Sequence, residues 1–153
     1  MKRKIQWGTV VFLCIYLLVL AYVCFLSEDY GRTELQNTYH YNFIPFHEII
    51  RFYTYREDVG MKAFILNMFG NIFAFMPFGF MIPILKQKYR EHMRGVAAQT
   101  FLLSLTIECI QLISRVGSFD VDDLILNTFG GILGFGCFWF MNHIRRCSFG
   151  KIQ

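Results

Sequence analysis

The chain has 153 residues, of which 55% are hydrophobic and 18% aromatic, and its formal net charge is +4. A soluble domain of this size has too small a core to bury so much apolar surface. The composition therefore excludes an ordinary soluble protein and indicates one that lipid surrounds. The basic residues stand in short clusters beside apolar stretches, which argues against nucleic acid as a partner and indicates membrane lipids.

The five cysteines all lie in or beside apolar segments, with no Cys-x-x-Cys pair and no spacing typical of zinc ligands. We therefore interpret them as buried apolar thiols. From the sequence we expect no metal site and no cofactor.

Four apolar windows are long enough to cross a membrane. The first, 7–26, exceeds the about 7–15 residues of a signal-peptide core and lacks a small-residue cleavage site, so we interpret it as a retained helix. The others lie at 64–85, 95–114 and 124–141, and each window approaches the 20 or so residues that a helix needs to cross about 30 Å of hydrocarbon. The sequence predicts an all-α integral membrane protein with one domain over 1–153 and four transmembrane helices.

The distribution of basic residues predicts the orientation. The N-terminal end, the loop at 86–94 and the C-terminal tail together hold 10 lysines and arginines, whereas the loops at 27–63 and 115–123 hold 5. Because cytoplasmic loops are enriched in these residues, we expect both termini in the cytoplasm. In a bacterial cell membrane, the loop at 27–63 and the acidic residues near 120 would then face the cell wall.

Within the long loop, residues 42–50 (NFIPFHEII) are too apolar for a free polar loop and too few to span. We interpret this stretch as an interfacial or re-entrant segment. His40 and His47 flank it, but two histidines seven residues apart on a surface loop are more often neither metal ligands nor proton carriers.

The third window contains an ionisable residue, Glu108, whose insertion at a helix centre costs about 2.5–3.5 kcal/mol on translocon scales. Gln111 and Arg115 follow at offsets of three and seven, so the three side chains share one helix face. Such a stripe should face other helices. The default interpretation of Glu108 is functional, because an apolar residue would span at lower cost.

Two other windows carry polar residues at the same depth. Together with the stripe of the third window they form a candidate ligand-binding pocket that opens toward the outer leaflet: Asn67, Asn71, Glu108, Gln111, Arg115, Asp122, Asp123 and Asn127. Each amide alone has a second interpretation, since Asn and Gln also cross-link membrane helices, at about 0.6 kcal/mol per bond. A pair of Glu108 and Arg115 could likewise join helices.

Small residues and prolines predict how two of the helices pack. Gly130 and Gly134 form a Gly-x-x-x-Gly pair, which allows close approach of another helix, either within this chain or in a homo-oligomer. Pro77 removes a backbone donor and is expected to kink the second helix, which should end near Pro83.

Taken in order, several short motifs resemble those of the VanZ family. They are NFIPF at 42–46, Asn67 and Asn71 leading into FMPFGF at 75–80, SLTIE at 104–108 with Gln111, then Arg115, FDVDD at 119–123 and NTFGG at 127–131. The resemblance implies an integral membrane protein that in some members is associated with low-level resistance to teicoplanin. It implies no established catalytic activity.

Two functions of different class remain open. The first is a non-enzymatic protein whose pocket binds a lipid-linked cell-wall precursor or the acyl chain of a lipoglycopeptide, with Arg115 meeting a phosphate. The second is a membrane enzyme acting on an isoprenoid-linked or phospholipid substrate, with Glu108 or Asp123 as general base. The sequence favours the first, because it shows no nucleophile motif and no phosphate-binding glycine loop. A third possibility is a structural or assembly subunit whose polar groups only pack its bundle.

The acidic residues near 120 raise a separate question of metal binding. Asp120, Asp122 and Asp123 could hold a divalent cation, but the sequence around them lacks a calcium-loop pattern. We interpret them as a solvated acidic turn.

Overall fold

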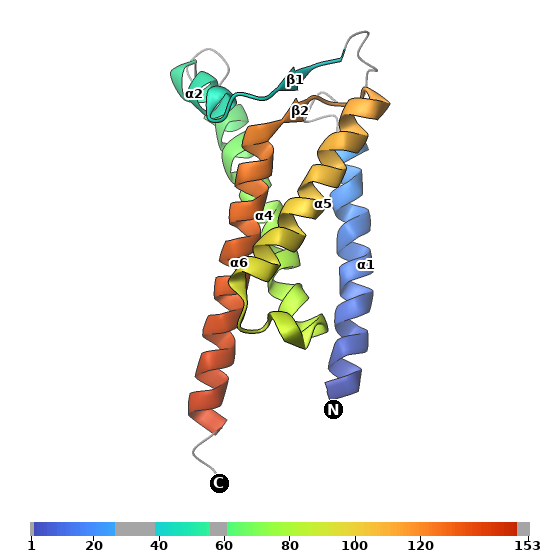
Figure 1. The fold of residues 1–153 in the computed structure, drawn as a ribbon, viewed down its shortest axis with the longest axis vertical. Coiled ribbons are helices and arrows are strands. Elements are labelled where there is room, and N and C mark those ends of the chain that lie inside the picture. Colours follow the sequence, from blue (N-terminus) through green and yellow to red (C-terminus); the bar gives the residue numbers. More distant parts are fainter. Residues whose placement is uncertain (1, 27–38, 56–60, 150–153) are drawn as a thin grey trace.

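The computed structural model describes residues 2–26, 39–55 and 61–149, so two parts of the predicted loop at 27–63, residues 27–38 and 56–60, lie outside the described residues. Within this part of the chain, four long helices run along the molecule (Figure 1). They are α1 (Lys2–Leu26), α4 (Met61–Leu85), α5 (Met93–Ser114) and α6 (Val121–Phe149). The shorter elements are β1 (Tyr41–Asn42), α2 (His47–Thr54), η2 (Gln87–Tyr89) and β2 (Phe119–Asp120).

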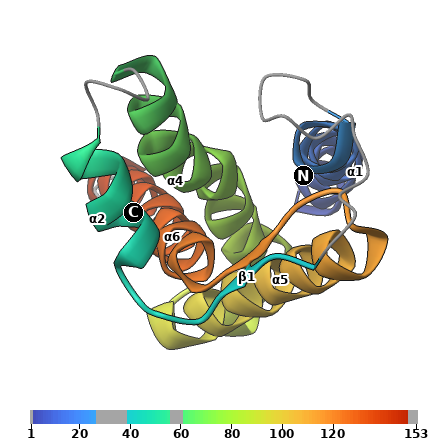
Figure 2. The same cartoon turned by 90° about the horizontal axis from the view of Figure 1, so that it is seen from above.

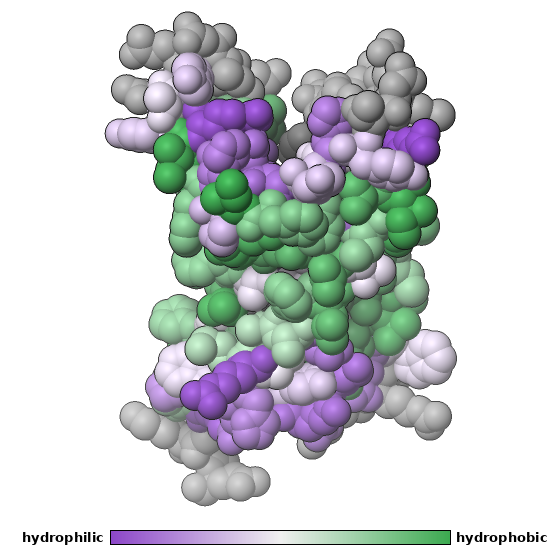
Figure 3. Space-filling view, turned by 45° about the horizontal axis from the view of Figure 1, so that its top comes forward, coloured by the Kyte–Doolittle hydropathy of each residue, from purple (hydrophilic) through white to green (hydrophobic). Residues whose placement is uncertain are grey.

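Each long helix contains an apolar segment of membrane-spanning length. The segments are Gln6–Leu26, Phe64–Leu85, Met93–Ser114 and Val121–Cys147. A helix satisfies its own backbone hydrogen bonds, which lipid cannot do. Figure 3 shows, on the face in view, an apolar band across the middle of the molecule and hydrophilic residues at both ends. The predicted all-α fold with four transmembrane helices is confirmed.

The closest helix pair is α4 with α6, and glycines make the approach possible. A Cβ atom at Gly130 would overlap the carbonyl oxygen of Ile72, and one at Gly134 would overlap that of Met76. Without a hydrophobic effect between helices in lipid, such close backbone contact is a main source of association. Of the two uses that the sequence left open for this glycine pair, the structure shows packing within the chain.

The first helix stands to one side of the others. Figure 2 shows α1 apart from the group formed by α4, α5 and α6. Among its described side chains only Leu20 is buried, and the Tyr16 hydroxyl donates to the carbonyl oxygen of Ala74 on α4 at 2.7 Å. Cys14 is exposed on this helix, and Cys109, Cys137 and Cys147 are exposed elsewhere, so these four thiols are not buried as predicted. Helices α4, α5 and α6 form the packed centre of the fold, and α1 covers one of its sides.

A two-stranded parallel ribbon crosses one end of the bundle, which we call the ribbon end. Strand β1 pairs with β2 so that Tyr41 lies beside Phe119 and Asn42 beside Asp120. The ribbon leads into α2, and the stretch predicted to be interfacial or re-entrant lies across the end of the helices (Figure 1). The opposite end, where α1 begins and α6 ends, is the termini end.

Prolines in α4 do not interrupt it. Pro77 and Pro83 both lie inside this helix, which continues to Leu85. The carbonyl oxygen of Pro83 accepts a hydrogen bond from Nε of Arg90, just beyond η2, at 3.3 Å. The turn after α4 is therefore tied back to the helix.

We expect Gly134→Ala to destabilise the protein by about 1–3 kcal/mol, the usual effect of overpacking, because its methyl group would overlap the carbonyl of Met76. Thermal unfolding in detergent measures the loss. Gly136→Ala is the matched control, since a Cβ atom there meets nothing within 4 Å. Equal stability of the two variants would contradict the glycine packing.

Candidate functional site

The three aspartates at the start of α6 do not form the solvated acidic turn that the sequence predicted, because Asp120 and Asp122 are buried and each of the three has a different partner. Asp120 lies immediately before the helix, and its Oδ1 accepts the backbone N–H of Asp122 at 2.9 Å. The same oxygen also accepts a hydrogen bond from Nδ2 of Asn42 at 3.1 Å, across the ribbon. Asp120 is thus the N-cap of α6, a position that aspartate favours.

Asp122 caps a different helix. Its side chain is 1% exposed, and its carboxylate accepts backbone N–H groups from Phe46, from Glu48 at 2.9 Å and from Ile49 at 3.1 Å. Helix α2 has no capping side chain at its own N-cap, where Phe46 has a left-handed φ of 66°. Because the first N–H groups of a helix have no partner within it, Asp122 of α6 satisfies the N-terminus of α2.

The predicted functional residue Glu108 also accepts a backbone donor. It is 2% exposed, and its Oε2 accepts the N–H of Asp120 at 3.0 Å. This bond ties the middle of α5 to the end of β2. Glu108 therefore has a structural role in addition to any functional one.

A small cavity lies beneath these contacts, where all four long helices meet. Its volume is about 30 Å³, which is enough for about two water molecules. The polar residues that line it come from α4, α5 and α6, and the apolar ones include residues of α1. The lining consists of Leu20, Val23, Cys24, Gly70, Asn71, Ala74, Phe75, Ile107, Glu108, Gln111, Asp123 and Asn127.

The polar side chains of the cavity bond to one another or to the surrounding backbone. Asn71 donates to the carboxylate of Asp123, and Gln111 donates to the carbonyl oxygen of Cys24 at 2.9 Å. Asn127 donates to the hydroxyl of Ser104 at 2.8 Å. Its own Oδ1 is buried and has no hydrogen-bond partner among the described residues.

The structure thus brings together five of the eight residues predicted to bind a ligand. These are Asn71, Glu108, Gln111, Asp123 and Asn127. Asn67 is half-buried on α4 and does not line the cavity, and Asp122 is directed to α2.

Arg115 lies apart from these five residues. It is exposed at the end of α5, where its guanidinium lies 4.6 Å above the ring of Tyr39 and donates to the Tyr39 hydroxyl at 3.2 Å. The cavity therefore lacks the cation that the sequence placed beside Glu108. Its lining offers carboxylate and amide groups, which suits hydrogen-bond donors of a ligand.

Sequence reasoning missed Ser104 and Asn42 as partners in the polar network. Ser104 lies one turn before Glu108, so helical periodicity could have placed it on the same face. The cap formed by Asp120 was also readable, because Asp immediately precedes the apolar run of α6. The capping of α2 by Asp122 joins residues 76 positions apart and left no local signal.

Comparison with known proteins gives one consistent result. The profile of the family described as VanZ/LLP1 matches residues 12–142, a range that includes every residue lining the cavity. The chain is 28% identical over 142 residues to Protein VanZ of Enterococcus faecium, with 92% of this chain and 80% of that protein covered. No solved structure matches.

The carboxyl of Asp120 should make the stability of the ribbon end depend on pH. Burial raises the pKa of Asp120, the charges of Asp122 and Glu48 raise it further, and the bonds from Asp122 N–H and Asn42 only partly oppose this. Because the folded-state pKa is raised, protonation of Asp120 favours folding, so its contribution to stability grows as pH falls through that pKa.

We expect Asp120→Asn to be more stable than the parent protein at neutral pH, since asparagine keeps the Oδ1 acceptor and the N-cap without the buried charge. The advantage should disappear as pH is lowered through the raised pKa of Asp120. Thermal unfolding in detergent across a pH series measures it, with Glu91→Gln, an exposed carboxyl, as control. A constant difference at every pH would contradict the assignment.

Proposed function

The chain belongs to the VanZ/LLP1 family, and from this membership and the ribbon-end geometry we propose that it contributes to low-level teicoplanin resistance or envelope homeostasis by binding an acylated or lipid-linked ligand. It is a multi-pass bacterial membrane protein. The binding site would be the cavity between its four long helices.

One observation carries the proposal: inside a membrane-spanning bundle lies a polar cavity in which a buried hydrogen-bond acceptor has no partner among the described residues. A buried acceptor without a partner, such as Oδ1 of Asn127, costs about 1–3 kcal/mol. Fewer polar residues would stabilise the bundle at lower cost, so the cluster is better explained by a ligand that donates hydrogen bonds.

The position of α1 supports entry from the lipid side. Leu20, Val23 and Cys24 of α1 form one wall of the cavity, and α1 is the helix that packs least against the rest. Movement of α1 away from α4 would enlarge a cavity that at about 30 Å³ is too small for a headgroup. An acyl chain could then stay in the lipid while polar groups of the same ligand reach Glu108.

The charge of the lining favours some ligands over others. Glu108 and Asp123 would repel a phosphate, and Arg115 lies on the surface beside Tyr39. Amide, hydroxyl or ammonium groups suit this lining better, and an acylated glycopeptide carries such donors. Among the binding ligands considered, the cavity therefore favours an acylated glycopeptide over the phosphate of a lipid-linked precursor.

The enzyme hypothesis has less support. Glu108 or Asp123 could act as a general base, but the residues that line the cavity include no His, Lys or Arg to relay a proton or to stabilise developing charge. Both carboxylates already accept hydrogen bonds from Asp120 and Asn71, respectively. Binding without catalysis is the simpler function for this arrangement.

The test compares teicoplanin and vancomycin susceptibility in a sensitive Gram-positive host that expresses the protein at matched membrane levels. We expect protection against teicoplanin only, and we expect Glu108→Ala to abolish it. Glu108→Gln should keep part of the protection, because an amide oxygen accepts the same bonds at about half the strength of a carboxylate. Glu91→Gln, at the exposed termini end, should behave as the parent.

Three outcomes separate the hypotheses. Complete loss of protection in Glu108→Gln at unchanged thermal stability would show that ionisation is required and would favour the enzyme. Loss of membrane level or thermal stability in the Glu108 variants would point to a purely structural role. No protection by the parent protein from either antibiotic would overturn the resistance proposal.

A further inference from the structure

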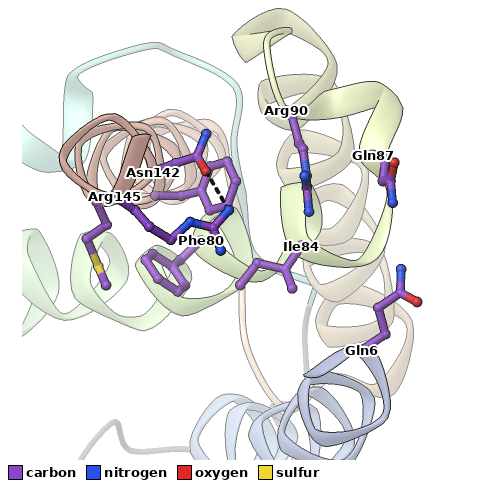
Figure 4. A pocket seen from close by; sticks show the side chains of 9 residues that line it. Gln6, Phe80, Ile84, Gln87, Arg90, Asn142 and Arg145 are labelled. Carbon is purple, nitrogen blue, oxygen red and sulfur yellow. Dashed lines mark hydrogen bonds between the residues drawn. The ribbon is translucent and has the colours of Figure 1, made fainter. Parts of the chain in front are cut away.

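A second cavity, larger than the one at the ribbon end, lies at the opposite end of the molecule, the termini end. Its volume is about 240 Å³, and Figure 4 shows side chains of α6 and side chains from the end of α4 and the η2 turn around it. The lining residues are Gln6, Phe80, Ile84, Gln87, Arg90, Phe138, Met141, Asn142 and Arg145. None of them was singled out by the sequence analysis as a site residue.

Two guanidinium groups give this cavity a positive charge. Arg145 donates to Oδ1 of Asn142 at 3.2 Å, and Arg90 donates through Nε to the carbonyl oxygen of Pro83 at 3.3 Å. Each of these bonds orients its guanidinium and uses one of five N–H donors, so donors remain for a ligand. Arg90 comes from the turn after η2 and Arg145 from α6, so the two cations approach the cavity from different elements.

No carboxylate neutralises these arginines among the residues that line the cavity. The nearby Glu91 instead forms an ion pair with Arg146, with 3.7 Å between Nη2 of Arg146 and Oε1 of Glu91, and neither residue lines the cavity. A site with two arginines, two glutamines and one asparagine presents mainly donors. It therefore suits an anion such as a phosphate, which a guanidinium binds through two parallel hydrogen bonds.

The rest of the lining is apolar and belongs to the membrane-spanning helices. Phe80 and Phe138 pack edge to face with ring centroids 6.1 Å apart, and Ile84 and Met141 lie one turn nearer the termini end. The volume is below the about 300–1,000 Å³ of a site that encloses a whole drug-sized ligand. A headgroup would fill it, and an attached acyl chain would leave along the apolar side.

We propose that this cavity binds the phosphate of an anionic membrane lipid, with Arg90 and Arg145 as the residues that hold it. The charge distribution predicts that the termini end faces the cytoplasm, where basic pockets between transmembrane helices bind anionic headgroups. The site is separate from the ribbon-end cavity and shares no lining residue with it. Its test therefore does not depend on the proposed function.

The experiment measures lipid binding to the purified full-length protein in detergent by native mass spectrometry. The probes are phosphatidylglycerol and phosphatidylcholine with identical acyl chains, and inorganic phosphate. We expect preferential binding of phosphatidylglycerol, weakened at least about tenfold in the double variant Arg90→Gln/Arg145→Gln, since each arginine supplies charge-assisted bonds. The single variant Arg145→Gln, which leaves the bond to Pro83 intact, should be weakened as well.

The control removes the same charge from the same end of the molecule. Arg94→Gln/Arg146→Gln changes two exposed arginines that do not line the cavity, and it should bind phosphatidylglycerol like the parent. Equal weakening in the control would show a general attraction to a basic surface and overturn the site. Equal binding of the two lipids would do the same. Inorganic phosphate that displaces phosphatidylglycerol at equal concentration would identify a soluble anion as the ligand and overturn the lipid assignment.

Discussion

The architecture of the ribbon end depends on buried carboxylates that accept backbone N–H groups. Glu108 holds the backbone of Asp120, Asp120 caps α6, and Asp122 caps α2. A helix N-terminus or a strand end needs acceptors from outside itself, and in this part of the molecule acidic side chains supply them. The bonds connect α5, the ribbon, α6 and α2 in one network. The strand pairing and the position of α2 over the bundle both follow from it.

Below this network, α4, α5 and α6 pack against one another, whereas most of α1 is not buried. Glycines bring α4 and α6 into backbone contact, and α5 packs against α6, whereas α1 lies along one side of the group. The two cavities then differ in character. The ribbon-end cavity is small and acidic and is lined on one side by α1, and the termini-end cavity is larger and basic. A single small domain thus presents mainly hydrogen-bond acceptors in the ribbon-end cavity and mainly hydrogen-bond donors in the termini-end cavity.

The apolar windows predicted the four long helices, and the glycine spacing predicted the face of α6 that packs closely against another helix. Both features depend on local periodicity in the sequence. Polar residues on shared helix faces also predicted a common site for five residues that line one cavity in the structure: Asn71, Glu108, Gln111, Asp123 and Asn127. Arg115 was misplaced because the helix ends there in a left-handed residue, with φ of 58°, which turns the side chain toward Tyr39. Contacts between distant segments, such as Asp122 with α2, and the termini-end cavity depend on tertiary packing and leave no periodic signal.

The most direct test of this account is hydrogen exchange of the backbone amides in α2. In Asp122→Ala, the amides of Glu48 and Ile49 lose their acceptor and should exchange faster than in the parent, while amides in the middle of α4 and α6 stay protected. Asp122→Asn, which keeps one oxygen acceptor, should lie between the two. Unchanged exchange at Glu48 and Ile49 in Asp122→Ala would contradict the claim that this carboxylate anchors α2 to the bundle.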